Sequence, residues 1–193
     1  LEVSTTTLGL PGKPVNLSVQ PTGVNMHLSW GPPTTNGGAE ITSYRVYRGT
    51  SAETMVSIAQ VTGTDYDDPD PENGETYIYY VTATNMVGEG QANMASATMV
   101  RAPGEPQSLT ITPSSHRITL RWSAPEHLGG SYLVGYRIYR ALSSGPVEMI
   151  AAVDGTEYID NGLENGVTYH YWVSAVNPLF EGESNGPLSA VPA

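Results

Sequence analysis

The 193-residue chain contains no cysteine, so neither disulfide bonds nor thiolate chemistry can contribute to its fold or its function. It has only 8 lysine and arginine residues against 19 acidic residues, which gives a formal net charge of −11. Nucleic-acid binding requires clustered cations that neutralise phosphates, so this balance argues against a nucleic-acid partner. It also disfavours attachment to an anionic membrane surface.

Long hydrophobic runs are absent as well. No apolar stretch approaches the roughly 20 residues of a membrane-spanning helix, so we expect no membrane insertion. The chain begins at Leu1 without a charged-then-apolar leader, which leads us to expect a mature fragment or an excised piece of a longer protein. What the chain does contain is 21 glycines and 15 prolines, a composition that favours short strands and many turns over helices.

The sequence repeats itself when it is shifted by 92 residues, and the two halves overlay without a gap. Pro-Gly-Lys-Pro at 11–14 meets Pro-Gly-Glu-Pro at 103–106, and Tyr-Arg-Val-Tyr-Arg at 44–48 meets Tyr-Arg-Ile-Tyr-Arg at 136–140. A repeat of this length is a whole small domain and not a solenoid unit. The expected organisation is a linker at residues 1–10, a first domain at 11–102 and a second domain at 103–193.

Alternation of apolar and polar residues predicts strands throughout each repeat. The run at 76–85 follows an Asn-Gly turn and places Tyr77, Tyr79, Val81 and Ala83 on one face, which we assign to the core. Seven short strands with no helical stretch are typical of a β-sandwich. The strands expected in the first domain lie at about 15–20, 26–30, 44–47, 55–61, 64–67, 76–85 and 93–100.

These motifs together resemble the fibronectin type III modules of prokaryotic extracellular enzymes and surface proteins. The resemblance rests on the proline-rich start, a tryptophan in the second strand, the Tyr-Arg-Val-Tyr-Arg strand, and Asn-Gly-x-Thr-Tyr-x-Tyr-x-Val-x-Ala-x-Asn at 73–85. It covers nearly all of residues 11–193, twice over. It implies an all-β fold of two tandem seven-stranded immunoglobulin-like sandwiches.

The resemblance also implies roles for the large aromatic residues. Trp30 and Trp122 should lie between the two sheets of their domains, where truncating a tryptophan costs about 3–5 kcal/mol. Tyr77 and Tyr169 should be the tyrosine-corner residues, whose hydroxyls bond back to the backbone of the preceding loop.

One departure from the family pattern lies just before this corner. Leu163 fits the pattern in the second domain, where we expect it to be buried beside Tyr169 and Trp122, whereas the first domain has Pro71. The acidic loop around Pro71 should be weakened by charge repulsion. We therefore expect the first domain to melt below the second. The short, proline-containing linker at 101–106 predicts limited bending between the domains and an extended pair.

The acidic stretch before this corner is the densest charge cluster in the chain. Calcium prefers several carboxylate oxygens, so the stretch is a candidate site, although its spacing does not fit an EF-hand. The equivalent loop of the second domain has lost most of the charge. We therefore favour a solvated turn and expect neither a metal nor another cofactor. The candidate ligands are Asp65, Asp67, Asp68, Asp70 and Glu72.

Outward-facing aromatic residues are the strongest candidates for a binding surface, because flat rings beside hydrogen-bonding groups suit a sugar ring or a protein partner. Ordinary cross-strand pairing explains the same residues without a ligand, and we favour it because the arrangement recurs in both domains. The set comprises Arg137, Tyr139, His170 and Trp172 in the second domain, and Arg45, Tyr47, Ile78 and Tyr80 in the first.

The loop between the last two strands is the second candidate surface. Integrin-binding members of the family carry Arg-Gly-Asp there, whereas this chain reads Met-Val-Gly-Glu at 86–89 and Pro-Leu-Phe-Glu-Gly at 178–182. Integrin binding is therefore not implied. Leu179 and Phe180 lie at the expected tip, where they either fold back onto the sandwich or form a contact site.

No motif indicates catalysis. The sequence contains no Gly-x-Ser-x-Gly elbow, no phosphate-binding glycine loop and no histidine pair with zinc-ligand spacing. We expect a non-catalytic spacer or interaction segment of a larger extracellular or cell-surface protein, monomeric in isolation, with an unknown protein or glycan partner. The alternative, which rests on Tyr139 and Trp172, is a carbohydrate-binding accessory module of a polysaccharide-degrading enzyme.

Overall fold

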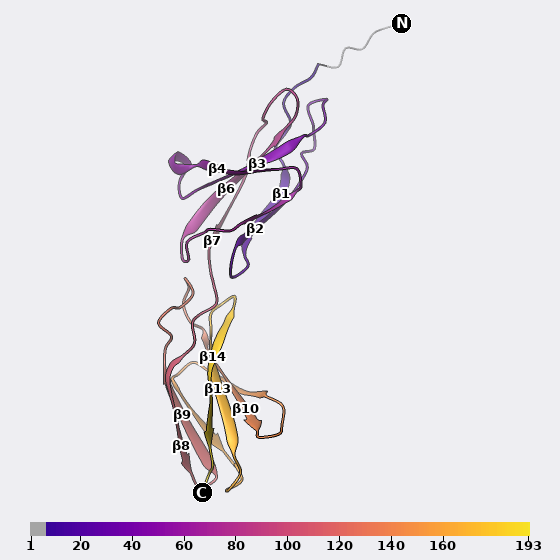
Figure 1. Ribbon diagram of the computed structural model, residues 1–193. Helices are drawn as coiled ribbons and strands as arrows, with labels where there is room; N and C mark the ends of the chain where they lie inside the picture. Colours follow the sequence, from indigo (N-terminus) through magenta and orange to yellow (C-terminus); the bar gives the residue numbers. More distant parts are fainter. Residues whose placement is uncertain (1–6) are drawn as a thin grey trace. The chain divides into compact units, whose positions relative to one another are not determined.

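Two β-sandwiches, each formed by one copy of the repeat, make up the residues 7–193 that the computed structural model describes (Figure 1). The chain divides into two compact units between Met99 and Val100. Most of the linker expected at 1–10 lies outside the described residues. Gly9 belongs to the first sandwich, because its amide donates a hydrogen bond of 2.8 Å to the carbonyl of Gly37.

The first sandwich pairs a three-stranded sheet, in the order β1-β2-β5, with a four-stranded sheet, in the order β4-β3-β6-β7. A single turn of 3-10 helix, η1 (Ala52–Thr54), connects β3 to β4. Nowhere in residues 7–193 is there a helix long and apolar enough to cross a membrane. The seven strands described in this unit are β1 (Val15–Pro21), β2 (Met26–Gly31), β3 (Ser43–Gly49), β4 (Val56–Val61), β5 (Asp65–Asp68), β6 (Thr76–Thr84) and β7 (Asn93–Thr98).

The second sandwich has the same plan, with sheets in the orders β12-β9-β8 and β11-β10-β13-β14. The predicted fold of two tandem seven-stranded sandwiches is therefore confirmed. Its strands are β8 (Gln107–Ser114), β9 (Arg117–Ser123), β10 (Gly135–Leu142), β11 (Glu148–Val153), β12 (Glu157–Asn161), β13 (Tyr169–Val176) and β14 (Glu181–Ala190).

Each sandwich is filled by one tryptophan and a column of alternating strand residues. Trp30 packs edge-on against Tyr44 with ring centroids 5.6 Å apart, and Trp122 packs in the same way against Tyr136 at 5.4 Å. The face of β6 that alternation assigned to the core is buried along its whole length. Period-two alternation therefore sorted the strand faces correctly.

The corner before β6 and β13 has the same hydrogen bond in both units. The hydroxyl of Tyr77 accepts a hydrogen bond from the amide of Glu72, and that of Tyr169 accepts one from Glu164, each at 3.1 Å. These bonds fix the chain as it enters the central strand of the four-stranded sheet.

The two corners also bury their differing residues. Leu163 is part of the second core together with Tyr169 and Trp122. Pro71, at the corresponding place in the first unit, is buried too. Both corner residues are therefore buried, and the lower melting temperature expected for the first domain stays a prediction.

The last strand is where the two sandwiches differ. In the first unit β7 runs beside β6 without interruption, and Met94 lies directly opposite Tyr80. In the second unit the register of β14 shifts opposite Trp172, where Gly186 and Pro187 form a bulge. Proline has no N–H to donate to a ladder, so it is tolerated at such a bulge.

The bulge adds one residue to the second repeat. Tyr77 pairs with Ala97, whereas Tyr169 pairs with Ala190, which is one residue further than the sequence shift of 92 predicts. The expectation of a gapless repeat is therefore wrong within the last strand.

Candidate functional site

A buried carboxylate joins the two sheets of the second sandwich. Asp160 on β12 accepts hydrogen bonds from the Arg140 guanidinium at 2.9 Å and from the Tyr171 hydroxyl at 2.6 Å, both from the opposite sheet. Burial raises the pKa of Tyr171, and the hydrogen bond to Asp160 raises it further, so the phenol stays protonated and donates. The Arg140 guanidinium also lies 5.7 Å from the ring centroid of Tyr169.

The first sandwich contains the same arrangement. Asp68 on β5 accepts bonds from Arg48 at 2.8 Å and from the Tyr79 hydroxyl at 2.7 Å, and Arg48 lies 5.0 Å from the ring centroid of Tyr77. Because the arrangement occurs at the same place in both units, we interpret it as part of the fold. The prediction that the acidic stretch is a solvated turn is wrong for Asp68, whose side chain is only 3% exposed.

The same stretch does not form a calcium site in the structure. Asp68 forms an ion pair with Arg48, and the Asp67 carboxylate lies within hydrogen-bond distance, 2.7 Å, of the His27 ring. No group of three or more His, Asp or Glu side chains in residues 7–193 is placed to hold a metal ion. The five carboxylates proposed as ligands, Asp65, Asp67, Asp68, Asp70 and Glu72, are thus not brought together.

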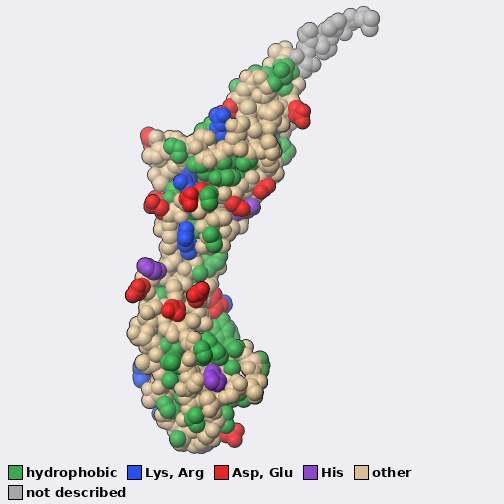
Figure 2. Space-filling view, viewed as in Figure 1, with side chains coloured by type: hydrophobic (Ala, Val, Ile, Leu, Met, Phe, Trp, Pro, Cys, Tyr) green, Lys and Arg blue, Asp and Glu red, His purple; other side chains and the backbone are tan. Residues whose placement is uncertain are grey.

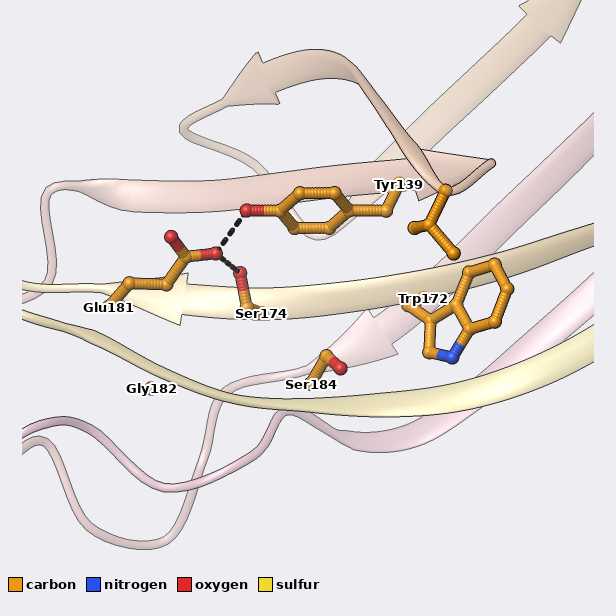
Figure 3. Close-up of a pocket in the computed structure, with 7 residues that line it drawn as sticks. Tyr139, Trp172, Ser174, Glu181, Gly182 and Ser184 are labelled. Atoms are coloured by element: carbon orange, nitrogen blue, oxygen red, sulfur yellow. Dashed lines mark hydrogen bonds between the residues drawn. The ribbon is translucent and has the colours of Figure 1, made fainter. Parts of the chain in front are cut away.

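A second ionic cluster lies on the outer face of the four-stranded sheet of the second unit. Glu181 at the start of β14 accepts hydrogen bonds from the Tyr139 hydroxyl at 2.5 Å and from the Ser174 hydroxyl at 2.5 Å (Figure 3). It also accepts a hydrogen bond from the Arg137 guanidinium. Burial alone would raise the pKa of Glu181. The bonds from Ser174, Tyr139 and Arg137 outweigh burial, so the pKa lies below its ordinary value of 4.5.

The first unit has this second cluster as well. Glu89 accepts bonds from Arg45 at 2.8 Å, from Tyr47 at 2.6 Å and from Thr82 at 2.6 Å. Burial again opposes the effect of the hydrogen bonds, and the pKa of Glu89 is again lowered overall. Sequence reasoning named Arg45 and Tyr47 but missed the glutamate, although Glu89 and Glu181 occupy the same position in the two repeats.

A hollow of about 330 Å³ lies beside the Glu181 cluster in the second unit (Figure 3). Tyr139 and Trp172, which the sequence placed on one outer face, are direct cross-strand partners in it. The Tyr139 hydroxyl points to Glu181 at one end, and the indole of Trp172 lies at the other. The lining residues are Tyr139, Val147, Trp172, Ser174, Glu181, Gly182 and Ser184.

Val147 and the rings of Tyr139 and Trp172 form the apolar part of this hollow. Val147 is 56% exposed, and Met149, which lies opposite Tyr139 on the neighbouring strand, is 54% exposed. Figure 2 shows hydrophobic side chains reaching the surface of the second sandwich on the face turned to the viewer. The hollow therefore combines an apolar wall with a carboxylate that is held in place.

The other predicted binding residues do not line the hollow. His170 faces Ala141 across the sheet, and its ring lies 2.7 Å from the Ser189 hydroxyl, so it does not line the hollow. Leu179 is 55% exposed, whereas Phe180 is half-buried. In the first unit, Ile78 lies opposite Gly49 and Tyr80 opposite Tyr47.

The Leu179–Phe180 loop is held by one asparagine. The side-chain oxygen of Asn177 accepts bonds from the amides of Leu179 and Phe180 at 3.1 and 2.8 Å. The backbone N–H of Asn177 also donates a hydrogen bond to the Phe180 carbonyl at 2.9 Å. The loop is thus an ordered turn with one exposed leucine.

Comparison with known proteins supports the fold and places the chain among large relatives. The Fibronectin type III domain model matches residues 12–98 and 103–191. Exoglucanase B of Cellulomonas fimi is 28% identical over 180 residues, which cover 86% of this chain and 15% of that protein. Protein sidekick-1 of Homo sapiens is 30% identical over 200 residues, which cover 95% of this chain and 9% of that protein.

A solved structure agrees in fold. The crystal structure of chicken CNTN1 FN1-FN3 domains is similar with a TM-score of 0.60 and 18% identity, covering 96% of this chain and 69% of that one. At this identity the likeness shows the fold alone. The matched relatives come from a bacterium, an archaeon and animals, so the prokaryotic type suggested by the sequence stays a prediction.

Proposed function

Because the chain belongs to the fibronectin type III family over residues 12–98 and 103–191, we propose that it is a non-catalytic pair of modules in a larger secreted or cell-surface protein. In this role it acts as a spacer between the other domains of that protein or binds a partner. A fold does not determine a function, and the contacts of the side chains bear on it more directly.

The observation that carries the proposal is the repeated use of the charged side chains. In both units one carboxylate ties the two sheets together. A second carboxylate ties the chain to the middle of the four-stranded sheet, from the segment before β7 in the first unit and from the start of β14 in the second. A catalytic acid needs a raised pKa near the working pH, whereas Glu89 and Glu181 have lowered ones. These groups are therefore suited to hold the sandwich and not to act as a general acid.

The relatives are consistent with a module that serves proteins with different tasks. The chain spans only 15% of one matched protein, named Exoglucanase B, and 9% of another, named Protein sidekick-1. An accessory role beside an enzyme and a contact role at a cell surface both agree with a non-catalytic module.

The test is a replacement experiment in a longer protein that carries this pair. The pair is exchanged for an unrelated tandem fibronectin type III pair of the same length. We expect the neighbouring domains to keep their specific activity on small soluble substrates. Loss of that intrinsic activity, or turnover by the purified chain that disappears in a Glu89→Gln, Glu181→Gln double variant, would contradict the proposal.

A further inference from the structure

The two sandwiches differ on their outer surface mainly around Trp172. In the first unit, the equivalent Tyr80 has Met94 directly opposite on the next strand. Side chains in such positions lie about 5 Å apart and cover one another. In the second unit, the strand beside Trp172 instead carries the bulge at Gly186 and Pro187.

Gly186 lies close against Trp172 and has no side chain of its own. A Cβ at Gly186 would lie 2.5 Å from the Tyr171 carbonyl oxygen and 3.3 Å from Trp172 Cδ1, and the backbone φ of Gly186 is +129°. Only glycine suits both the conformation and the close approach. The bulge therefore brings a residue without a side chain to the place where the first unit has a methionine.

The hollow beside Trp172 also has spare hydrogen-bonding capacity. Within residues 7–193, no partner bonds to the Ser184 hydroxyl or to the indole N–H of Trp172. The Glu181 carboxylate accepts three hydrogen bonds, and a carboxylate has about four acceptor positions. A ligand would thus find one free donor, one hydroxyl and one free acceptor position.

The charge and size of the hollow narrow the ligand further. The positive charge of Arg137 and the negative charge of Glu181 cancel within their ion pair, so neither an anion nor a cation is selected. The volume of about 330 Å³ lies at the lower end of the range for small-molecule sites. A neutral ring with an apolar face and several hydroxyls satisfies all of these conditions.

We infer that this hollow binds one hexopyranose ring of a neutral polysaccharide, stacked on Trp172 with its hydroxyls directed to Ser184 and Glu181. The inference rests on the proposed interaction role and names its ligand class. The ionic cluster of Glu181 recurs in the first unit and belongs to the fold, whereas the tryptophan at this position and the bulge beside it are features of the second unit. The second sandwich is therefore the binding module of the pair.

The test is a titration of the whole chain with three neutral oligosaccharides, cellohexaose, laminarihexaose and mannohexaose. Trp30 and Trp122 are each only 6% exposed, so a change in tryptophan fluorescence reports mainly on Trp172. We expect saturable binding of at least one hexaose at millimolar or lower concentration, with a fluorescence change and a measurable heat in calorimetry.

Matched variants tie the binding to the hollow, with calorimetry as the readout and thermal melts to show that each variant folds. Trp172→Ala should weaken binding more than tenfold. Tyr80→Ala, the equivalent change in the first unit, should leave it unchanged. Ser184→Ala introduces the residue that the first repeat has at Ala92, and it should weaken binding about fivefold.

Three outcomes would overturn the inference. They are binding of none of the hexaoses, binding that survives in folded Trp172→Ala, and Trp172-dependent binding of a lysine-rich peptide instead, which would assign a cation–π contact. None of them affects the non-catalytic role, which the replacement experiment tests separately.

Discussion

The two sandwiches have the same internal scaffold but different outer faces. Each has a carboxylate between its sheets and a glutamate clamped by an arginine, a phenol and a hydroxyl. Only the second has a bulged last strand beside its outer aromatic residue. The recurring carboxylate clusters are best explained by the stability of the fold. The bulge, which differs between the units, is the better guide to a specific function.

The recurrence has a physical reason. A carboxylate buried between two sheets is costly unless it is paired and hydrogen-bonded, so its arginine and tyrosine partners have to be kept with it. The outer face has no such constraint. One extra residue in an edge strand changes what covers Trp172 and leaves the core residues in place.

The largest expected effect comes from removing the buried carboxylates. Asp160→Ala leaves the Arg140 charge half-buried and the Tyr171 hydroxyl without its partner, so it should lower the free energy of unfolding by about 3 kcal/mol. Asp68→Ala should cost the first unit a similar amount, as measured by urea unfolding. A loss of stability in only one of the two variants would show that the buried carboxylates do not have equivalent roles in the two units.

The control for this prediction is a neighbouring acid with an exposed partner. Asp67 and His27 have side chains 58% and 44% exposed. Asp67→Ala should therefore cost less than about 1 kcal/mol.

The next largest effect concerns the bulge. Gly186→Ala places a Cβ against the Tyr171 carbonyl at a positive φ, so it should destabilise the second unit by about 2 kcal/mol. Met94→Ala, at the equivalent and 62% exposed position of the first unit, should change stability by less than about 0.5 kcal/mol. Equal melting temperatures for the two variants would contradict the close contact of Gly186 with the Tyr171 carbonyl in the bulge.

A smaller effect is expected from pH. Glu89 and Glu181 have pKa values lowered by folding, so their contribution is complete above the ordinary value of 4.5 and is lost as pH falls through the lower folded value. Stability should thus decline below about pH 4.5. Glu89→Gln and Glu181→Gln should each cost about 1 kcal/mol at pH 7 and flatten the decline in this window. A decline that is equally steep in the double variant would contradict the assignment.

The smallest effect is expected at the corner before the central strand. Pro71 is buried where the second unit has Leu163, so Pro71→Leu should change the stability of the first unit by less than about 1 kcal/mol. Thermal melts of the variant and the unmodified chain measure this. A gain of about 2 kcal/mol or more would show that Pro71 packs less well than Leu163, in line with the expected lower melting temperature of the first domain.

Much of the fold could be predicted because it depends on local patterns. Alternation placed Tyr77 and Tyr79 in the core, and the repeat located the same elements in the second unit. It also put Tyr139 and Trp172 on one face, where the structure makes them partners. It also placed His170 on that face, one cross-strand pair along from Trp172, but it could not show that the His170 ring lies against the Ser189 hydroxyl.

The ionic networks could not be predicted in this way. Asp68 lies among several acidic residues that look alike in sequence, and only the pairing of β5 with β2 turns it between the sheets. A comparison of Asp68 with Asp160, and of Glu89 with Glu181, would have been the available signal. The proline at 187 within the last strand likewise indicated a bulge that the gapless alignment concealed.

Gly186 in the bulge lies beside Trp172 without a side chain, whereas Tyr80, the equivalent residue of the first unit, has Met94 opposite it. This difference predicts that a soluble probe reaches Trp172 more easily than it reaches position 80. It is tested most directly by ¹⁹F NMR of the chain labelled with 5-fluorotryptophan, with a soluble paramagnetic probe added and Tyr80→Trp as the internal comparison. We expect the Trp172 resonance, identified by its loss in Trp172→Phe, to broaden most. The resonance of the new tryptophan at position 80, which lies opposite Met94 on the neighbouring strand, should broaden clearly less. Equal broadening at the two positions, or a Trp172 resonance as protected as those of Trp30 and Trp122, would contradict the account.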